Sequence, residues 1–296
     1  MANFTSRFYL TCKNYNLNQP IRSSLLRITA VVFMLAAFNP GVVSGQLLQQ
    51  DFTGVNPITQ YVSATPTNQQ FTAIGSSGAG TTVSAATAKL VYTCSAASGT
   101  FSRIQDFSPV PTTLKYSLDL SVTCAAGATN VAQFKVGAGF SNAHTPELNT
   151  STYGRFGVDY VATDKFRIRD LVANNNTNTG LSAANYTFSG TQTITWYLNN
   201  SGSSLSYMAP GGSSETVAND KMDIWVGTTK VFNDINPLTP ALNMTDLKFI
   251  INGGNGSVAI DNINITTAQC TFPATVSIPQ NVTCPCLLYT SDAADD

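Results

Sequence analysis

Charged residues are scarce in this sequence. Lysine, arginine, aspartate and glutamate make up 10% of the 296 residues, and the formal net charge at pH 7 is −1. So few and so balanced charges leave no basic patch of the kind that holds a phosphate backbone, and we expect no nucleic-acid partner. Histidine occurs once, at His144, and the cysteines show no CxxC spacing. The sequence therefore predicts no zinc site with the usual ligands.

Helix signals are also nearly absent. Glutamate, a strong helix former, occurs only at Glu147 and Glu215, and after the N-terminal segment no stretch carries an amphipathic helix pattern. No repeat with a period of about 20 to 50 residues is visible, which argues against a solenoid or a propeller. Threonine, serine, asparagine and glycine are abundant instead, a composition typical of strands joined by polar turns.

The N-terminal segment has the features of a secretory signal peptide. Basic residues up to Arg27 precede an apolar run, Ile28 to Phe38, which helix-breaking and small residues follow. We expect residues 1–45 to be removed by cleavage after Gly45, which leaves a protein that is secreted or displayed at the cell surface. The alternative is a short membrane anchor. The run is shorter than the roughly 20 residues of a membrane span, so we expect no membrane span in the mature protein.

The C-terminal segment departs from the pattern of the rest of the chain. Residues 268–285 are interrupted by prolines and read as a linker or the start of a further domain. Residues 286–296, CLLYTSDAADD, look like a translated sequencing adaptor, the alternative being an acidic tail. We leave them out of the fold. One domain, 46–267, is expected between the two ends.

Apolar and polar residues alternate in short runs through this domain, as in half-buried strands. The clearest runs are 114–122, 155–161, 165–171, 191–199, 222–226, 247–251 and 257–265. Residues 162–164 are expected to form a hairpin turn, and the glycine-rich stretch 252–256 to join the last two runs in another hairpin. We predict an all-β fold, a two-sheet antiparallel β-sandwich of the jelly-roll or concanavalin-like type.

Several motifs in order carry a resemblance that covers most of this domain. They are LLQQDF at 47–52, GRFGVDY at 154–160, FSGTQTITWYLNNSG at 188–202, ETVANDKMDIWVGTTKVFND at 215–234 and AIDNINI at 259–265. The chain resembles a type of uncharacterised exported β-sandwich protein common in Bacteroidetes, often secreted by the type IX system. The resemblance implies a place at the outer membrane surface. The ending AIDNINI is also similar to the last strand of jelly-roll carbohydrate-binding modules.

In those modules an Asp of the last strand often joins residues near the first strand around a structural calcium ion. The resemblance implies that Asp261 takes this role here, and Asp51 can meet it if the first and last strands pair. Carboxylate and amide oxygens are the ligands that Ca²⁺ prefers. Alternatively, Asp261 only caps a strand end. The sequence thus gives Asp51 and Asp261 as candidate metal ligands.

Four cysteines lie in residues 46–285, outside the signal segment and the adaptor-like end. An even number of cysteines in an exported protein predicts disulfides. The simplest pairing is Cys94 with Cys124 and Cys270 with Cys284. The alternative is that they are free, buried thiols.

Two aromatic residues are candidates for a sugar-binding platform. Trp196 shares a face with apolar neighbours and is expected in the core, whereas Tyr197 points the other way. In the run 222–226, Trp225 and Asp223 share a face opposite Ile224. A tryptophan stacks on the CH groups of a sugar while a carboxylate accepts hydroxyl protons. The sequence thus gives Trp225, Asp223 and Tyr197 as candidate ligand-binding residues, unless a loop covers the Trp225 face.

No catalytic motif is visible. No GxSxG elbow surrounds a serine, His144 reads as a loop residue, and both glutamates lie in apparent loops. We therefore expect a secreted or cell-surface, non-catalytic binding or adhesion module for an extracellular glycan or surface polymer. The alternatives are a structural display domain without a small ligand, and a polysaccharide-degrading enzyme or its accessory domain.

Overall fold

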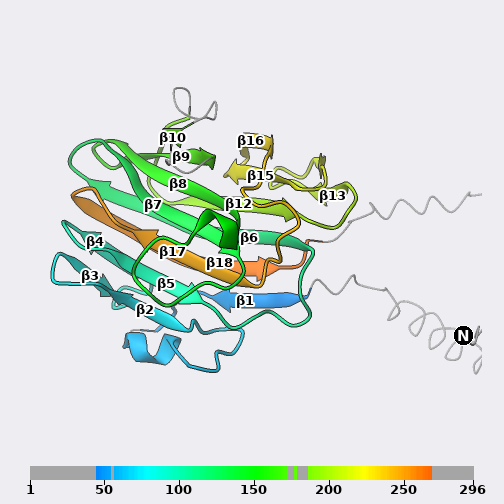
Figure 1. Ribbon diagram of the computed structural model, residues 1–296. Coiled ribbons are helices and arrows are strands. Elements are labelled where there is room, and N and C mark those ends of the chain that lie inside the picture. The colour runs from blue at the N-terminus through cyan, green and yellow to red at the C-terminus, as the bar shows by residue number, and fades with distance from the viewer. Residues whose placement is uncertain (1–44, 55–56, 173–176, 179–185, 269–296) are drawn as a thin grey trace, which may run out of the picture. The chain divides into compact units, whose positions relative to one another are not determined.

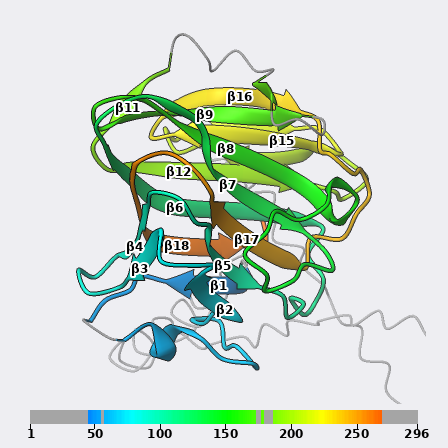
Figure 2. The ribbon, with the colours of Figure 1, turned by 60° about the vertical axis from the view of Figure 1, so that its left-hand side comes forward.

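A computed structural model describes residues 45–54, 57–172, 177–178 and 186–268 of the chain. Two antiparallel β-sheets face each other across a common core (Figures 1 and 2). The helical segments of the described ranges are single 3-10 turns, η1 (Ile58–Tyr61) and η2 (Asn149–Ser151). None of them has the length or hydropathy of a membrane span. The predicted class, an all-β jelly-roll or concanavalin-like sandwich, is confirmed.

The first sheet has the strand order β16-β15-β12-β6-β18-β4-β3, and β1 pairs with β18. Its strands are β1 (Gln46–Gln50), β3 (Thr81–Ser84), β4 (Leu90–Cys94), β6 (Thr113–Cys124), β12 (Gln192–Asn199), β15 (Lys221–Val226), β16 (Thr229–Ile235) and β18 (Gly256–Thr266). The expected meeting of the first and last strands is confirmed, because Gln50 lies opposite Ile263.

The second sheet has the strand order β10-β9-β8-β7-β17-β5-β2, and β11 pairs with β9. Its strands are β2 (Ala73–Ser76), β5 (Gly99–Arg103), β7 (Ala128–Gly137), β8 (Thr152–Ala162), β9 (Lys165–Val172), β10 (Thr177–Asn178), β11 (Phe188–Ser189) and β17 (Asp246–Ile251). A separate hairpin, β13 (Leu205–Met208) and β14 (Ser214–Val217), forms its own two-stranded sheet.

The core is built on a row of phenylalanines that lie side by side on four strands of the second sheet. Phe101, Phe249, Phe134 and Phe156 are register partners on β5, β17, β7 and β8. Successive ring centroids are 5.2, 4.9 and 4.8 Å apart. Trp196 of the first sheet meets Phe156 edge-on at 5.1 Å. Such aromatic contacts bury large apolar areas and join the two sheets.

The predicted hairpin at 252–256 is wrong. β17 pairs with β5 and β7, whereas β18 pairs with β4, β6 and β1 in the other sheet. The stretch between them is a corner from one sheet to the other. Gly254 has a positive φ of 73°, and a Cβ at Gly254 or Gly256 would lie 2.9 Å from the Tyr160 ring. Glycine is therefore required by this close approach as much as by the turn.

The predicted bond between Cys94 and Cys124 is also wrong, because both side chains are free, buried thiols. Both residues lie opposite Gly256, on either side of β18. Two strand spacings separate their Cα atoms by roughly 9.5 Å, and a disulfide requires less than about 7 Å. Each thiol donates instead to a carbonyl oxygen, that of Ala97 or Ala162. Cys270 and Cys284 lie outside the described residues.

Candidate functional site

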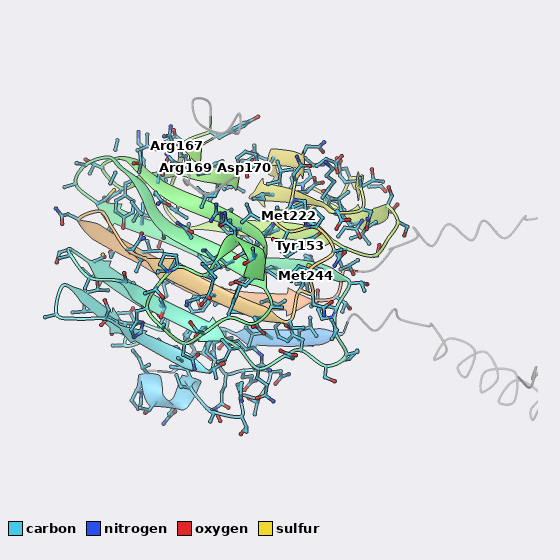
Figure 3. The ribbon with its side chains drawn as sticks, viewed as in Figure 1. Tyr153, Arg167, Arg169, Asp170, Met222 and Met244 are labelled. Carbon is cyan, nitrogen blue, oxygen red and sulfur yellow. The ribbon has the colours of Figure 1, made fainter. Side chains whose placement is uncertain are left out.

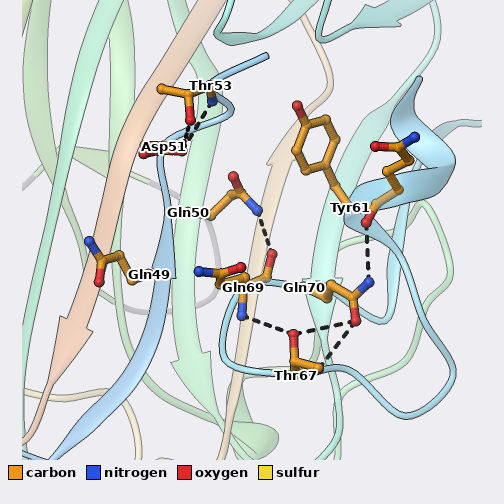
Figure 4. A pocket seen from close by; sticks show the side chains of 9 residues that line it. Gln49, Gln50, Asp51, Thr53, Tyr61, Thr67, Gln69 and Gln70 are labelled. Carbon is orange, nitrogen blue, oxygen red and sulfur yellow. Dashed lines mark hydrogen bonds between the residues drawn. The ribbon is translucent and has the colours of Figure 1, made fainter. Parts of the chain in front are cut away.

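Two neighbouring pockets open beside the end of β1, and the residues Gln49, Gln50 and Asp51 belong to both. The first, which we call the amide pocket, has a volume of about 410 Å³ (Figure 4). It is lined by Gln49, Gln50, Asp51, Thr53, Gln60, Tyr61, Thr67, Gln69 and Gln70. The second, the acidic pocket, has about 250 Å³ and is lined by Gln49, Gln50, Asp51, Ser117, Asp119, Thr193, Asn262, Ile263 and Asn264.

A buried arginine fixes the wall of the amide pocket. Nη1 of Arg103 donates to the carbonyl oxygens of Thr67 at 2.6 Å and Gln70 at 2.9 Å. Burial lowers the pKa of this guanidinium, and charge-assisted hydrogen bonds of this kind are among the stronger ones in proteins. The Gln49 amide adds a backbone bond of 2.7 Å to the Asn68 carbonyl. The wall is therefore held to both β5 and β1.

The glutamines of this pocket divide into two kinds. Gln50 and Gln70 are held in place: Oε1 of Gln50 accepts from the Phe52 amide at 2.7 Å, and Nε2 of Gln70 donates to the Gln60 carbonyl at 3.1 Å. The side chains of Gln49, Gln60 and Gln69 are exposed. A carboxamide both donates and accepts hydrogen bonds, as a sugar hydroxyl does. The pocket thus offers hydrogen-bond donors and acceptors that match sugar hydroxyls, on a wall that Gln50 and Gln70 hold in place.

The acidic pocket is lined by two carboxylates, Asp51 just after β1 and Asp119 of β6, and by amide side chains of the last strand. Asp119 accepts from Thr193 Oγ1 at 2.6 Å and from Asn262 Nδ2 at 2.8 Å. Asp261 lies opposite Asp119 in the ladder. The ladder is irregular between Asp261 and Asn264, and Asn262 has a φ of 48°. This bulge turns the Asn262 amide toward Asp119.

The carboxylates of this region differ in their pKa. Hydrogen bonds from the amide and hydroxyl of Thr53 lower the pKa of Asp51. Burial raises the pKa of Asp261, and the negative charges of Asp119 and Asp51 add to that effect. The structure therefore brings the predicted Asp51 and Asp261 into one electrostatic environment. Asp119 was missed, although its alternation with Leu118 and Leu120 marks it as a residue of the outer face.

The arrangement does not form a ready-made metal site. Across the described ranges, no three Asp, Glu, His or Cys side chains converge in a way that could hold a metal ion. Any cation here would need amide or carbonyl oxygens beside the carboxylates, which Ca²⁺ accepts. Asn262, Asn264 and Gln50 supply such oxygens in the acidic pocket.

The predicted aromatic platform is wrong, because its face is covered. The alternation is as expected, yet the side chains of Trp225, Asp223 and Tyr197 are only 5%, 0% and 2% exposed. The β13–β14 hairpin lies over them, and Tyr207 of that hairpin stacks on Tyr197 with ring centroids 3.8 Å apart. The hydroxyl of Tyr207 donates to Asp223 at 2.5 Å and accepts from Trp225 Nε1 at 3.0 Å.

A lysine completes the network beneath the hairpin. Nζ of Lys230 contacts Asp223 at 3.0 Å and Glu215 at 2.9 Å, and it lies 5.1 Å from the centre of the Trp225 ring. Burial tends to lower the pKa of Lys230, but the hydrogen bonds to the two carboxylates outweigh burial and raise it. These polar groups satisfy one another, so the cluster fastens the hairpin to the sheet.

Comparison with known proteins does not place the chain in a family. No family description matches the sequence, and no curated protein matches it. Among solved structures, a Bacillus subtilis protein of unknown function with a galectin-like fold is 9% identical, with a TM-score of 0.42 over 67% of this chain and 89% of that chain. The carbohydrate recognition domain of Emp46p, in a form with a single substitution, is 9% identical, with a TM-score of 0.41 over 74% and 98%.

The exoplasmic/lumenal domain of VIP36, in a form bound to Ca²⁺ and Man3GlcNAc, is 6% identical, with a TM-score of 0.40 over 69% of this chain and 88% of that chain. Identities and TM-scores this low leave the function to be argued from the site itself.

Proposed function

We propose that this chain is a secreted or cell-surface binding module that holds a neutral glycan in the amide pocket. The observation that carries the proposal is the lining of that pocket, where five glutamines, two threonines, a tyrosine and an aspartate converge on one cavity. Its volume of about 410 Å³ is within the common range for small-ligand sites, about 300–1,000 Å³.

The charge of the site favours a neutral ligand. Among the residues that line the two pockets, none is Lys, Arg or His, whereas Asp51 and Asp119 are carboxylates. Carboxylates accept hydrogen bonds from sugar hydroxyls and repel acidic sugars. A glycan that extends from the amide pocket past Asp51 would reach the acidic pocket as well.

Export is part of the proposal and is supported by the sequence. The segment expected to be the signal peptide, residues 1–45, lies almost wholly outside the described residues, as do the linker and the adaptor-like end. A low content of charge and a surface rich in hydroxyl and amide groups suit a protein of the extracellular space. The resemblance to exported Bacteroidetes proteins points to the cell surface.

The screening experiment is a glycan array probed with the exported chain, its Gln69→Ala variant and an Asn255→Ala control. Asn255 is an exposed amide at the β17–β18 corner, roughly 20 Å along the strand from the acidic pocket. The proposal predicts selective binding to neutral glycans that Gln69→Ala weakens at least about fivefold and Asn255→Ala leaves unchanged. A folded protein that binds no glycan would favour the structural display domain instead.

Calcium is a second part of the proposal. Burial raises the pKa of Asp261, and the negative charges of Asp119 and Asp51 add to this effect; a Ca²⁺ ion beside Asp51 and Asp261 would relieve that added like-charge repulsion. Binding to the folded state alone raises stability by mass action. We expect about 1 mM CaCl₂ to raise the unfolding temperature by a few degrees over a chelator, and Asp261→Asn to remove the difference. An equal unfolding temperature in both buffers would contradict the calcium site.

A pair of neighbouring carboxyls makes hydrolysis the second candidate function. The charge of Asp51 acts on Asp261, and glycosidases use two carboxyls that flank the scissile bond. Glycans bound on the array should therefore be incubated with the protein and assayed for new reducing ends. New reducing ends that form with the unchanged protein, but with neither Asp51→Asn nor Asp261→Asn, would establish an enzyme. Glycans that stay intact would support a non-catalytic binding module.

A further inference from the structure

Three cations lie side by side on the outer face of the second sheet. Lys248, Lys135 and Arg155 are register partners on β17, β7 and β8. They occupy the row next to the phenylalanine row of the core, and because side chains alternate along a strand they point the opposite way. We call Lys248, Lys135 and Arg155 the cation row. Arg167 and Arg169 of β9 (Figure 3) bind Asp159 at 2.9 and 3.0 Å, and Arg169 lies opposite Gly157, two residues along β8 from Arg155.

The cation row is buried although it is on the outside of the sandwich. The exposed fractions of Lys135 and Lys248 are 0% and 1%. The segment 138–151, which we call the strap, joins β7 to β8 and crosses in front of β17 in the view of Figure 1. A buried charge is costly unless it is paired and hydrogen-bonded, so the partners of these cations show what the row is built to hold.

Glu147 of the strap supplies the carboxylate that contacts the row. Its Oε1 lies 2.5 Å from Nζ of Lys248. Lys135 reaches the main-chain carbonyl of Glu147 at 3.0 Å, an uncharged acceptor, and Nη1 of Arg155 reaches the side-chain oxygen of Asn149 at 3.0 Å. Arg155 also donates through Nε to the Leu171 carbonyl at 2.8 Å, and the charge of Asp170 acts on it. The strap itself thus brings one carboxylate to the two lysines, and a ligand carboxylate between Lys135 and Lys248 would replace a neutral carbonyl by a charged acceptor at Lys135.

The strap is fastened over the row by polar contacts. Nδ1 of His144 lies 2.7 Å from Thr100 Oγ1, Asn142 accepts from Ser102 Oγ at 2.8 Å, and Nζ of Lys248 donates to the Ser141 carbonyl at 3.0 Å. The apolar side chain of Leu148 is 73% exposed and points away from the sheet. Water or a ligand can take over such polar contacts when the strap moves, so their net contribution to stability is modest. None of residues 141–148 is buried, so this part of the strap can leave the sheet while the buried Phe140 stays in place.

We propose that the cation row is a binding site for the carboxylates of an acidic oligosaccharide, and that Glu147 occupies this site until a ligand displaces residues 141–148 of the strap. The hydroxyls of Thr100 and Ser102 and the amide of Gln133 lie on the same outer face, in register with the row or one position pair away. They supply hydrogen bonds to sugar hydroxyls beside the cations. This site is separate from the amide pocket, and the inference does not depend on the neutral glycan.

The test compares an oligogalacturonate with its fully methyl-esterified form, which has the same chain without charge. Calorimetric titrations use the whole exported protein, Glu147→Gln, and Glu215→Gln as a matched control that breaks another lysine–glutamate pair. We expect Glu147→Gln to bind the oligogalacturonate about tenfold more tightly than the unchanged protein, because the internal competitor is gone. Glu215→Gln should match the unchanged protein. The ester is itself a neutral glycan that the amide pocket can hold, so any affinity for it should be the same in all three proteins.

Hydrogen exchange of the unchanged protein gives a second measurement that does not depend on a variant. Saturating oligogalacturonate should increase exchange at residues 141–148 several-fold while the rest of the second sheet stays protected. Equal affinity of Glu147→Gln and the unchanged protein for the oligogalacturonate would overturn the proposal. So would a gain in affinity of Glu147→Gln for the ester equal to that for the acid, or hydrogen exchange of the strap that does not respond to the oligogalacturonate.

Discussion

At the scale of residues, the same side-chain types serve as core and as surface, and their neighbours decide between the two. Trp225 and Asp223 lie on the face that alternation assigns to them, but a hairpin distant in the chain covers that face. No local pattern around Trp225 reveals this cover. For Asp51 and Asp261 the resemblance to carbohydrate-binding modules, together with the condition that the terminal strands pair, supplied the expectation, and the pairing of β1 with β18 meets that condition.

Trp225 is thus expected to act in stability. Trp225→Ala removes a buried ring from the cluster under the β13–β14 hairpin and should lower the free energy of unfolding by about 3 kcal/mol, as for other large-to-small core changes. Denaturant titration followed by circular dichroism measures this loss. Glycan affinity of the folded fraction should stay unchanged, and a selective loss of affinity with normal stability would reinstate the ring as a binding surface.

Lys135 should make stability depend on pH. Burial, together with the charges of Arg155 and Lys248, lowers its pKa from 10.5 to about 8 in the folded protein. Between about pH 8 and 10.5 the unfolded chain therefore binds more protons at this residue, so its contribution to stability rises with pH. Relative to Lys135→Met, the unfolding free energy should rise by on the order of 2 kcal/mol from pH 7 to pH 10.5. A difference in unfolding free energy between the two proteins that does not change with pH would contradict a buried Lys135 with a lowered pKa.

At the scale of elements, alternation located the long strands well. The run 114–122 is contained in β6, the run 191–199 matches β12, and the turn between 161 and 165 joins β8 to β9. Strand pairing was harder to predict, since Asn and Gly in 252–256 suit a hairpin and a corner between sheets equally. The ring of Tyr160 lies against this stretch and favours the corner over the hairpin. Tyr160 is remote in sequence, so no local pattern reveals the contact.

The corner between β17 and β18 yields a direct test. A Cβ at position 256 would lie 2.5 Å from the Thr123 carbonyl and 2.9 Å from the Tyr160 ring, whereas one at position 253 meets nothing within 4 Å. Gly256→Ala should therefore lower the free energy of unfolding by about 1–3 kcal/mol. Gly253→Ala is the matched control and should change it little. Equal behaviour of the two variants in urea titrations would argue for a simple exposed hairpin.

At the scale of the whole molecule, the order of strands within a sheet keeps apart residues that the sequence seemed to join. Cys94 and Cys124 both lie near strand ends, but β18 is inserted between their strands. Such an insertion follows from the order of strands in the sheet, which depends on long-range pairing and is invisible to local patterns. The amide pocket was missed for a similar reason, because η1 and the loop 66–70 meet β1 only after folding.

A prediction at this scale concerns the oxidation state of the Cys94 and Cys124 thiols. In the exported protein Cys94 and Cys124 should be reduced and slow to react with a thiol reagent, because both side chains are buried. Unfolding in denaturant should make both reactive. Peptide mapping without reductant that recovers a linked pair of Cys94 and Cys124 peptides would contradict the strand order described for the first sheet.

The central claim is that the amide pocket binds a neutral glycan, and nuclear magnetic resonance of side-chain amides tests it most directly. A glycan selected by array screening is titrated into ¹⁵N-labelled protein, and the NH₂ signals of glutamine and asparagine are followed. We predict saturable shifts of the Gln49, Gln60 and Gln69 signals, with Asn255 unmoved. Saturable shifts confined to other amides, with those three glutamines unchanged, would contradict the assignment of the site.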